Sequence, residues 1–420
     1  MTMRPGALVC LDIERAAVGG RMIARDGGRV VLVRGAIPGE RVEARIERVQ
    51  RQVAFADTVR VLVPSPDRIP VPAGLASAGQ LLAHVADPRQ RLLKAEMIAD
   101  ALRRIGKIAL DHPVEVLGGP SDGYRTRARA HVRGGAVGFY EDGTHHLCAI
   151  GPTRQLSAAS VEILERVGRA VHDHARGIDA EIEWAENAAG TERAVHVTLA
   201  DPRGLGPIGS LPPVDGVNGG SVSAAATSAP VRRLWGTPRV IDRLRVGAGE
   251  ALVGHDARAF FQGNRYLLQP LVDEVVGRLD GPVVDLYAGV GLFAVGAAAA
   301  GHVVTAVEGE AIAAADLAAN AVPWPNLTVV HAAVEAHLAS ARPALETAIV
   351  DPPRSGLSGE ALAGVLAWRP ARLVYVSCDP ATLARDLRRC LDAGYRLERV
   401  RGVDLFPRTG HVEAVVTLVC

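Results

Sequence analysis

Cys378 is the residue whose type and position most clearly offer chemistry. It ends the apolar run LVYVSC and precedes Asp379 and Pro380, so the sequence predicts a buried strand that ends at a turn. A lone cysteine is most often a small buried apolar residue. At a strand end, a thiolate with a lowered pKa or a nearby proton donor can instead add to an electron-poor carbon. We therefore predict that Cys378 is a nucleophile.

A glycine-rich turn predicts a cofactor site. In PVVDLYAGVGLFAV an apolar strand delivers Asp285, and Gly289 and Gly291 then precede a helix, as at the start of a nucleoside-binding crevice. Glu308 follows Gly291 by seventeen residues, where a carboxylate can accept hydrogen bonds from both ribose hydroxyls; the alternative is an ordinary surface carboxylate. The turn has no third glycine and no lysine to hold a pyrophosphate, which favours S-adenosylmethionine over NAD.

Two further motifs contain carboxylates. DPPRSGL begins at Asp351 directly after the run TAIV, and its two prolines stiffen the chain and remove two backbone donors, so the carboxylate keeps a fixed direction. The alternative is a simple turn that ends a strand. Glu413 lies just inside a closing strand, and His411 shares its face because strand side chains alternate with a period of two. His411 then either orients a partner or is structural.

A thiol and a carboxylate together suit one difficult reaction. Carbon 5 of uracil is a poor nucleophile, but a thiolate that adds to carbon 6 moves electron density to carbon 5, which can then take a methyl group from a sulfonium. A base must next remove the carbon 5 proton so that the cysteine can leave. In this interpretation Cys378 is the nucleophile and Glu413 is the base.

Residues 251–420 must position these side chains. Predicted strands and helices alternate there, which implies an α/β fold with a mostly parallel sheet covered by helices on both faces. Ligands of such sheets bind beyond the carboxyl ends of the strands. The strands are expected at residues 283–286, 303–307, 327–331, 348–350, 373–377, 395–403 and 412–419. Asp285, Glu308, Asp351 and Cys378 therefore fall at strand ends.

The N-terminal residues 1–63 predict a small β-barrel. Short apolar strands alternate with glycine turns, about five strands in roughly sixty residues. Arginines are interleaved with the apolar positions. They either bind an RNA backbone or belong to a solvated exterior, since acidic residues offset many of the charges.

Residues 64–250 are expected to form a mixed α+β domain. PSPDRIPVP at 64–72 predicts a linker, and apolar residues at three- and four-residue spacing predict a helix from Pro88 to Ile105. A second amphipathic helix is expected at 158–175. Loops are expected at 204–230, where glycine, proline and alanine gather.

Basic residues gather on a predicted hairpin at 124–143. Basic and apolar residues alternate there around a GG turn, so that Arg125, Arg127 and Arg129 lie partly along one face. We predict that these three arginines bind RNA. The alternative is surface charge paired within the protein.

Composition argues against several classes of protein. The net charge is +1, from 47 basic and 46 acidic residues, so composition by itself does not predict a polybasic nucleic-acid binder. Five scattered cysteines without a C-x-x-C pair argue against disulfides and a thiolate metal site, and we expect a reducing cytoplasm. No stretch predicts a membrane span or an export signal. We expect a monomer, since no segment shows a self-complementary apolar face.

Four motifs in this order, DLYAGVGLF, DPPRSGL, YVSCDP and DLFPRTGHVE, resemble those of the RNA uracil-5-methyltransferases, which act on tRNA and ribosomal RNA. FFQGN at 260–264 resembles a further segment of that family. The resemblance implies a Rossmann-like class I methyltransferase domain that uses S-adenosylmethionine. The implied cofactor contacts are Gln262, Tyr287, Glu308 and Asp351, with Cys378 as nucleophile and Glu413 as base. The segment GGRMIARDGGRVVLVRGAIPGERV resembles a TRAM domain, an OB-like barrel that binds RNA.

Two positions depart from the pattern of this family. Many relatives hold an iron-sulfur cluster through cysteines just after the barrel, but SAGQLLAH at 77–84 has serine and glutamine there and Cys148 is alone, so we predict no cluster. Asp379 stands where asparagine often follows the nucleophile. An ionised carboxylate there would disfavour the thiolate unless it points elsewhere.

We therefore predict an enzyme that methylates carbon 5 of a uridine in structured RNA after flipping the base out of its stack. A second hypothesis is an amino-methyltransferase that uses DPPR to hold an exocyclic amine and needs no cysteine. A third is an RNA-binding protein with a degenerate methyltransferase domain, suggested by the missing cluster cysteines and Asp379.

Overall fold

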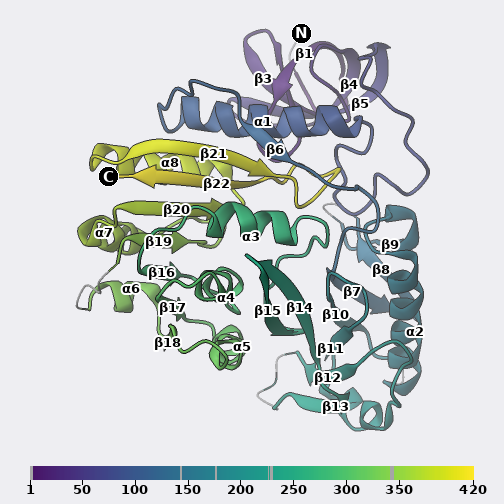
Figure 1. Cartoon of the computed structure of the whole chain (residues 1–420). Helices are drawn as coiled ribbons and strands as arrows, with labels where there is room; N and C mark the ends of the chain where they lie inside the picture. Colours follow the sequence, from purple (N-terminus) through teal and green to yellow (C-terminus); the bar gives the residue numbers. More distant parts are fainter. Residues whose placement is uncertain (1–2, 142–143, 176, 226, 228–229, 341–344) are drawn as a thin grey trace.

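The computed structural model describes residues 3–141, 144–175, 177–225, 227, 230–340 and 345–420, so residues 142–143 of the expected hairpin and 226 and 228–229 of the expected loops lie outside it. The described residues form a barrel, a central sheet and a large C-terminal sheet (Figure 1). The barrel lies over helix α1 (Asp87–Arg104), and the two sheets lie below that helix. Among the described residues, no helix is long and apolar enough to span a membrane.

The N-terminal barrel closes in the strand order β1-β2-β3-β5-β4. Its strands are β1 (Leu8–Ala16), β2 (Met22–Asp26), β3 (Arg29–Arg34), β4 (Arg41–Val49) and β5 (Val53–Val63). Alternate side chains point inward, so Val31, Val33 and Ala44 are fully buried. Gly27 and Gly28 both have positive φ angles, as the tight turn between β2 and β3 requires. The expected small barrel is confirmed.

The central sheet has seven strands in the order β13-β12-β11-β10-β7-β8-β9, and helix α2 (Ala158–His174) packs on one face. The strands are β7 (Arg127–Arg133), β8 (Ala136–Tyr140), β9 (Leu147–Ala149), β10 (Ala180–Glu186), β11 (Arg193–Leu199), β12 (Gly219–Ala224) and β13 (Arg232–Gly236). Three short 3-10 helices connect them: η1 (Gly151–Thr153), η2 (Pro202–Leu205) and η3 (Pro207–Ser210).

The expectation of loops throughout 204–230 was wrong for β12. This strand pairs in parallel with β11 although it begins with two glycines, which usually weaken a strand. Close packing explains them, because a Cβ on Gly219 would lie 2.1 Å from the backbone of Thr237. A Cβ on Gly220 would lie 2.7 Å from the ring of Trp235.

The C-terminal sheet has eight strands in the order β18-β17-β16-β19-β20-β22-β21-β6. They are β16 (Val283–Leu286), β17 (Val304–Glu308), β18 (Leu327–His331), β19 (Thr347–Val350), β20 (Arg372–Ser377), β21 (Arg396–Val403), β22 (Glu413–Val419) and β6 (Glu115–Leu117). Helices α3 (Leu268–Val276), α4 (Leu292–Ala299) and α5 (Ala311–Ala321) cover one face. Helices α6 (Val334–Leu338), α7 (Gly359–Trp368) and α8 (Pro380–Asp392) cover the other. This arrangement confirms the expected α/β fold class.

Several elements join the C-terminal unit from outside the expected range 251–420. Strand β6 pairs in parallel with β21, and α1 shares a core with α7 and α8. The hairpin of β14 (Arg239–Val246) and β15 (Gly249–Asp256) packs in the core that contains α4. These contacts cross the expected boundary between 64–250 and 251–420, and the division at 1–63, 64–250 and 251–420 stays a prediction. A three-residue strand that pairs with a distant one leaves no local pattern in the sequence, so the pairing of β6 could not be expected.

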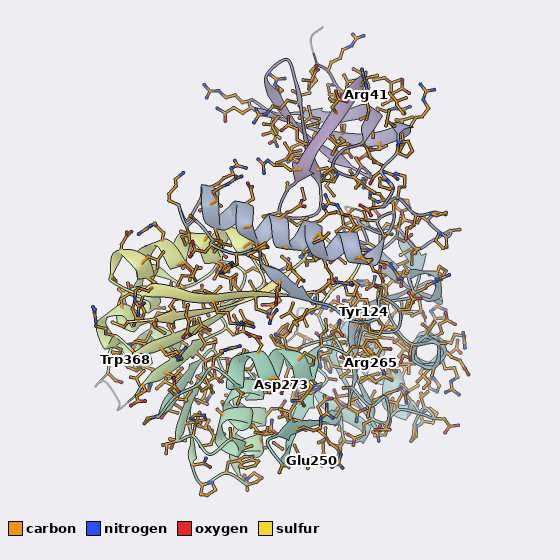
Figure 2. The ribbon with its side chains drawn as sticks, turned by 45° about the horizontal axis from the view of Figure 1, so that its top comes forward. Arg41, Tyr124, Glu250, Arg265, Asp273 and Trp368 are labelled. Carbon is orange, nitrogen blue, oxygen red and sulfur yellow. The ribbon has the colours of Figure 1, made fainter. Side chains whose placement is uncertain are left out.

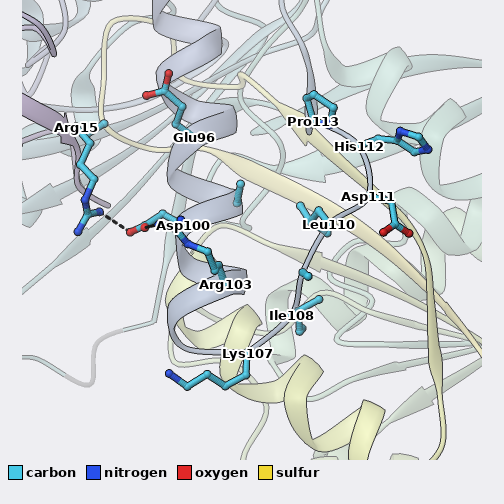
Figure 3. Close-up of a pocket in the computed structure, with 13 residues that line it drawn as sticks. Arg15, Glu96, Asp100, Arg103, Lys107, Ile108, Leu110, Asp111, His112 and Pro113 are labelled. Atoms are coloured by element: carbon cyan, nitrogen blue, oxygen red, sulfur yellow. Dashed lines mark hydrogen bonds and ion pairs between the residues drawn. The ribbon is translucent and has the colours of Figure 1, made fainter.

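The barrel contacts the C-terminal unit at the loop between β21 and β22. A Cβ on Gly410 would lie 2.3 Å from the carbonyl carbon of Gly19, in the turn between β1 and β2. Leu82 N also donates to the carbonyl oxygen of Arg408 at 2.8 Å. The barrel also contacts α1, because Arg15 of β1 pairs with Asp100 of α1 at 2.6 Å, beside a groove formed by α1 and residues 107–113 (Figure 3).

Gly410→Ala should destabilise the protein by about 1–3 kcal/mol, the usual cost of overpacking, because the added methyl group has no room beside Gly19. Urea unfolding measures this change. Gly359→Ala is the matched control, since no atom lies within 4 Å of the added carbon at the start of α7, and its effect should stay within ~0.5 kcal/mol. Equal stabilities of the two variants would contradict the close contact between barrel and loop.

Candidate active site

Strand order brings the predicted site residues to the end of the C-terminal sheet where its parallel strands finish. In the parallel ladders Leu286 is opposite both Val307 and Val350, so Tyr287, Glu308 and Asp351 leave the sheet at the same edge. Strand β20 continues this row and ends one residue before Cys378. Strand β22 is antiparallel, and therefore begins at that edge, with Glu413 as its first residue.

The glycine-rich turn and Glu308 form a cradle for a polar ligand. Gly289 has a φ of +57°, and no atom lies within 4 Å of the position of a Cβ there, so the space above the turn is open. Glu308 accepts hydrogen bonds from the backbone N–H groups of Gly289 at 2.8 Å and Glu310 at 2.6 Å. These two donors fix the carboxylate at the mouth of the turn. Tyr287 has a φ of +63°, and burial raises the pKa of its half-buried hydroxyl to about 12.

The loop that contains Gln262 is held by contacts on both sides. Gly263 O accepts from Thr126 N at 3.0 Å, and Asn264 Nδ2 donates to Leu405 O at 2.9 Å. Arg265 N donates to Tyr124 O at 2.9 Å, where the central and C-terminal units meet (Figure 2). Gln262 itself is buried. The central domain therefore fixes the backbone on which the predicted cofactor ligand stands.

Cys378 and Glu413 face a shared site from adjacent strands. Ser377 is paired with Ala414 between β20 and β22, which places the following cysteine next to the preceding glutamate. Burial, and next the charge of Glu413, raise the pKa of the Cys378 thiol to about 11. Burial also raises the pKa of Glu413 well above its usual range, with a further contribution from Asp351. The thiol and the carboxyl groups therefore interact electrostatically across the ladder.

Asp351, Asp285 and Arg354 complete the charge distribution. Burial raises the pKa of Asp351 to about 7. Burial and the charge of Asp351 raise the pKa of the fully buried Asp285 well above its usual range. The exposed guanidinium of Arg354 acts in the opposite direction, since its charge lowers the pKa of both Cys378 and Glu413. Arg354 was not predicted as a site residue, although it lies within the motif DPPRSGL, and Asp285 was expected at the crevice without an assigned role.

Helix α8 fixes the loop that contains Arg354. Asp386 accepts hydrogen bonds from Leu357 N at 3.0 Å and from the hydroxyl of Tyr375 at 2.8 Å. Arg385 donates to Ser355 O at 3.0 Å. These contacts link the loop both to α8 and to β20. The position of Arg354 relative to Cys378 is therefore fixed.

Asp379 caps helix α8 rather than facing the thiol. Its Oδ1 accepts hydrogen bonds from Ala381 N at 2.8 Å and Thr382 N at 2.9 Å. Asparagine and aspartate are equally good residues for this position. The departure from the family pattern at Asp379 is therefore compatible with a reactive Cys378.

His411 lies near the end of the loop that leads into β22, two residues before Glu413. Partial burial, and then the charges of Arg354, Lys94 and Arg125, lower the pKa of its imidazole. Its ring meets Phe406 edge to face, with 6.1 Å between the centroids. The lowered pKa favours the neutral imidazole, which fits both an orienting and a structural role.

The three predicted RNA-binding arginines have different surroundings. Arg125 donates to Gln155 and to Arg127 O, and burial lowers its pKa. Arg127 donates to Ala257 O at 2.7 Å, and burial lowers its pKa to about 10. Only Arg129 of the three is exposed, and it pairs with Glu181 and Glu183, both at 3.0 Å. Their contact with RNA stays a prediction.

Residues 77–84 are tied to η1 by a buried amide. Gln80 Nε2 donates to Leu75 O at 2.7 Å and to Thr153 O at 2.8 Å. Within the described ranges, no group of three or more histidine, cysteine or acidic side chains could hold a metal ion.

Known proteins are similar to this chain in sequence. Residues 231–420 match the family model of tRNA (uracil-5-)-methyltransferases, and residues 5–59 match that of the TRAM domain. A 23S rRNA (uracil(1939)-C(5))-methyltransferase of Pseudomonas putida is 32% identical over 96% of this chain and 92% of its own length. An uncharacterized RNA methyltransferase of Gloeobacter violaceus is 30% identical over 99% of this chain and 98% of its own.

A solved structure has the same fold. It is the Pyrococcus abyssi tRNA (uracil-54, C5)-methyltransferase in complex with S-adenosyl-L-homocysteine, which is 23% identical with a TM-score of 0.73. The similarity covers 97% of this chain and 100% of that one.

Two substitutions beside Cys378 should change its reactivity in opposite directions. Arg354→Gln removes a charge that lowers the pKa of the thiol, so less thiolate is present at pH 8 and alkylation should slow by roughly threefold to tenfold. Glu413→Gln removes a charge that raises this pKa, so alkylation should accelerate by a similar factor. Mass spectrometry of the Cys378 peptide after timed exposure to iodoacetamide measures both rates.

Arg354→Lys is the control, because it keeps the charge and should react at close to the unmodified rate. Changes of the same sign in the Arg354→Gln and Glu413→Gln variants would contradict the electrostatic description of the site.

Proposed function

The chain belongs to the family of RNA uracil-5-methyltransferases, and from this premise we propose that it methylates carbon 5 of a uridine in tRNA or ribosomal RNA in the cytoplasm. The observation that carries the proposal is that Cys378, directly after β20, and Glu413, at the start of β22, lie side by side at the carboxyl ends of the parallel strands. A thiol and a base at one site are what addition to carbon 6 and removal of a proton from carbon 5 need.

We propose S-adenosylmethionine as the cofactor, held by Gln262, Tyr287, Glu308 and Asp351. The open space over Gly289 and the oriented Glu308 carboxylate fit an adenosine whose ribose hydroxyls donate to that carboxylate. When bound, the cofactor supplies a methyl group on an electrophilic sulfonium. The described crevice offers no lysine beside the glycine turn, which again suits a ligand without a pyrophosphate.

The covalent steps assign one bond change to each residue. The thiolate of Cys378 forms a bond to carbon 6 of the uracil ring, and the electron pair of the double bond moves to carbon 5. Carbon 5 would then take the methyl group from the sulfonium, whose bond to that methyl group would break and leave a neutral thioether. The Glu413 carboxylate removes the carbon 5 proton, the electrons of that C–H bond restore the double bond, and the bond between sulfur and carbon 6 breaks.

The raised pKa values affect the first and last steps of this reaction, because both steps transfer a proton. A thiol with a pKa of about 11 is almost fully protonated at pH 7, so its proton must pass to a neighbouring base as the sulfur attacks. The carboxyl group of Asp351 is the candidate, since its charge influences this thiol and the Glu413 carboxylate then stays free for the carbon 5 proton. A buried carboxylate with a raised pKa is also a stronger base toward carbon 5 than an exposed one.

The barrel and the hairpin of β7 and β8 would hold the RNA. Arg129 is exposed and can exchange its glutamate partners for phosphate oxygens, whereas Arg125 and Arg127 are half-buried and donate within the protein, so we expect them to contribute less. Barrel arginines are likewise partly paired, as Arg34 is with Asp57 at 2.5 Å. We therefore expect binding to depend on salt, but less steeply than for a polybasic protein.

An amino-methyltransferase remains the alternative to test, because it would use the DPPR motif without a covalent step. The family membership and the pairing of Cys378 with Glu413 favour the carbon 5 reaction. The family also favours an active enzyme over a degenerate RNA-binding protein.

Cys378→Ala should abolish transfer of labelled methyl groups to bulk tRNA and ribosomal RNA, because carbon 5 is then never activated. Binding of S-adenosylmethionine, measured by calorimetry, should change by less than about twofold, since the thiol is not among the proposed cofactor contacts. Cys390→Ala, in the buried face of α8, is the control for loss of a cysteine and should retain activity. Methylation by the Cys378→Ala variant would support the amino-methyltransferase.

Glu413→Gln should trap RNA on the protein, because the proton of carbon 5 stays in place and the sulfur cannot leave. Denaturing gels should show a covalent complex with uridine RNA and the cofactor, while turnover falls by a factor on the order of 10² to 10⁴, as for the loss of a general base. Full turnover without a trapped complex would remove Glu413 from its proposed role.

A further inference from the structure

Lys94 of α1 is a fully buried cation that reaches the loop before Glu413. Its Nζ lies 2.5 Å from Asp404 Oδ1 and 2.9 Å from the carbonyl oxygen of Phe406. Burial lowers the pKa of Lys94, and the charge of Asp404 opposes this change. Both partners lie more than three hundred residues along the chain from Lys94.

The Lys94–Asp404 pair is better explained by the positions that it fixes than by any gain in the stability of the fold. Taking an ammonium and a carboxylate out of water costs about as much as their attraction returns, so an apolar pair of similar size would often be as stable. Strong directional contacts do, however, fix the atoms that they join. Here they join α1 to the loop 404–412, which runs from β21 to β22.

The atoms fixed by Lys94 are close in the chain to Glu413. Asp404 directly follows Val403, and Val403 is the partner of Glu413 in the ladder between β21 and β22. Asp404 N also donates to Leu117 O at 2.8 Å. By binding Asp404, Lys94 fixes the end of β21. Because Val403 at that end pairs with Glu413, the contact also fixes the start of β22.

Other contacts from the same part of the chain act on the far side of this loop. Gln90, one helical turn before Lys94, accepts a hydrogen bond from Arg408 N at 2.7 Å. Leu82 N donates to Arg408 O at 2.8 Å. Residues 82–94, outside the methyltransferase segment, thus hold both the beginning and the middle of the loop.

We propose that Lys94 is a positioning residue for the proton-removal step: through Asp404 and the Phe406 carbonyl it sets the loop 404–412 and thereby the direction of the Glu413 carboxylate. This inference rests on the proposed carbon 5 reaction. It assigns to α1, in the N-terminal half of the chain, control over one chemical step. Cys378 depends on other contacts, and the Gln262 loop, which meets the loop 404–412 through Asn264 and Leu405 O, is also held by Thr126 and Tyr124.

RNA that contains 5-fluorouridine separates this step from the earlier ones. Addition of the thiolate to carbon 6 and methyl transfer to carbon 5 proceed, but the fluorine on carbon 5 cannot leave as a proton does, so the adduct persists without any action of the base. Adduct formation with this RNA therefore reports Cys378 and the cofactor. Turnover on uridine RNA reports those steps and Glu413 together.

Lys94→Met should lower turnover on uridine RNA by about 10- to 100-fold, the effect of misplacing a catalytic group by about 1 Å. The rate of adduct formation with 5-fluorouridine RNA should stay within about threefold of the unmodified protein, and the adduct with uridine RNA should accumulate. Arg104→Met, an exposed cation near the end of α1, is the matched control and should change neither rate.

Asp404→Asn keeps the shape of the loop and provides a second variant in case Lys94→Met does not fold. It should shift the two rates in the same way, and the double variant should be no slower than the slower single one because both changes remove the same contact. Equal losses in both rates, or unchanged turnover, would overturn the positioning role. Failure of the unmodified protein to form the 5-fluorouridine adduct would instead overturn the proposed function, and this inference with it.

Discussion

The site depends on keeping a thiol and buried carboxyl groups together at one sheet edge, where each makes ionisation of the others harder. Cys378, Asp351 and Glu413 all have raised pKa values, with burial as the largest cause, and the charges of neighbouring carboxylates raise the pKa of Cys378 and Glu413 further. Such a group is unstable unless the backbone fixes its members. Hydrogen-bonded ladders on both sides of β20 provide this constraint, because they leave the strand ends no freedom to separate.

The cation Arg354 partly offsets the effect of burial and of the carboxylates on these pKa values. Arg354 lowers the pKa of Cys378 and Glu413 but is exposed, so its effect is moderated by water. Its loop is tied to α8 through Asp386, and α8 in turn is capped by Asp379 directly after the nucleophile. The nucleophile, its cation and its base are thereby placed by three neighbouring strand ends and one helix.

Much of this could be predicted from the sequence, because strand ends in a parallel sheet have local patterns. Asp285, Glu308, Asp351 and Cys378 each follow a short apolar run, and the chain topology then requires a common edge. The contacts that join distant segments could not be predicted in this way. A lysine within an amphipathic helix is ordinarily an exposed residue, and nothing near Lys94 in the sequence indicates Asp404. The same holds for β6, and for Arg127, whose backbone partners come from a different unit.

The most direct test of the covalent role of Cys378 is to locate the RNA on the protein. The unmodified protein would be incubated with S-adenosylmethionine and 5-fluorouridine RNA, digested with protease and nuclease, and sequenced by tandem mass spectrometry. We predict a methylated fluorouridine nucleotide on the peptide that contains Cys378 and on no peptide that contains Cys10, Cys148, Cys390 or Cys420. A nucleotide on another cysteine, or methylated RNA with no nucleotide on Cys378, would contradict the account.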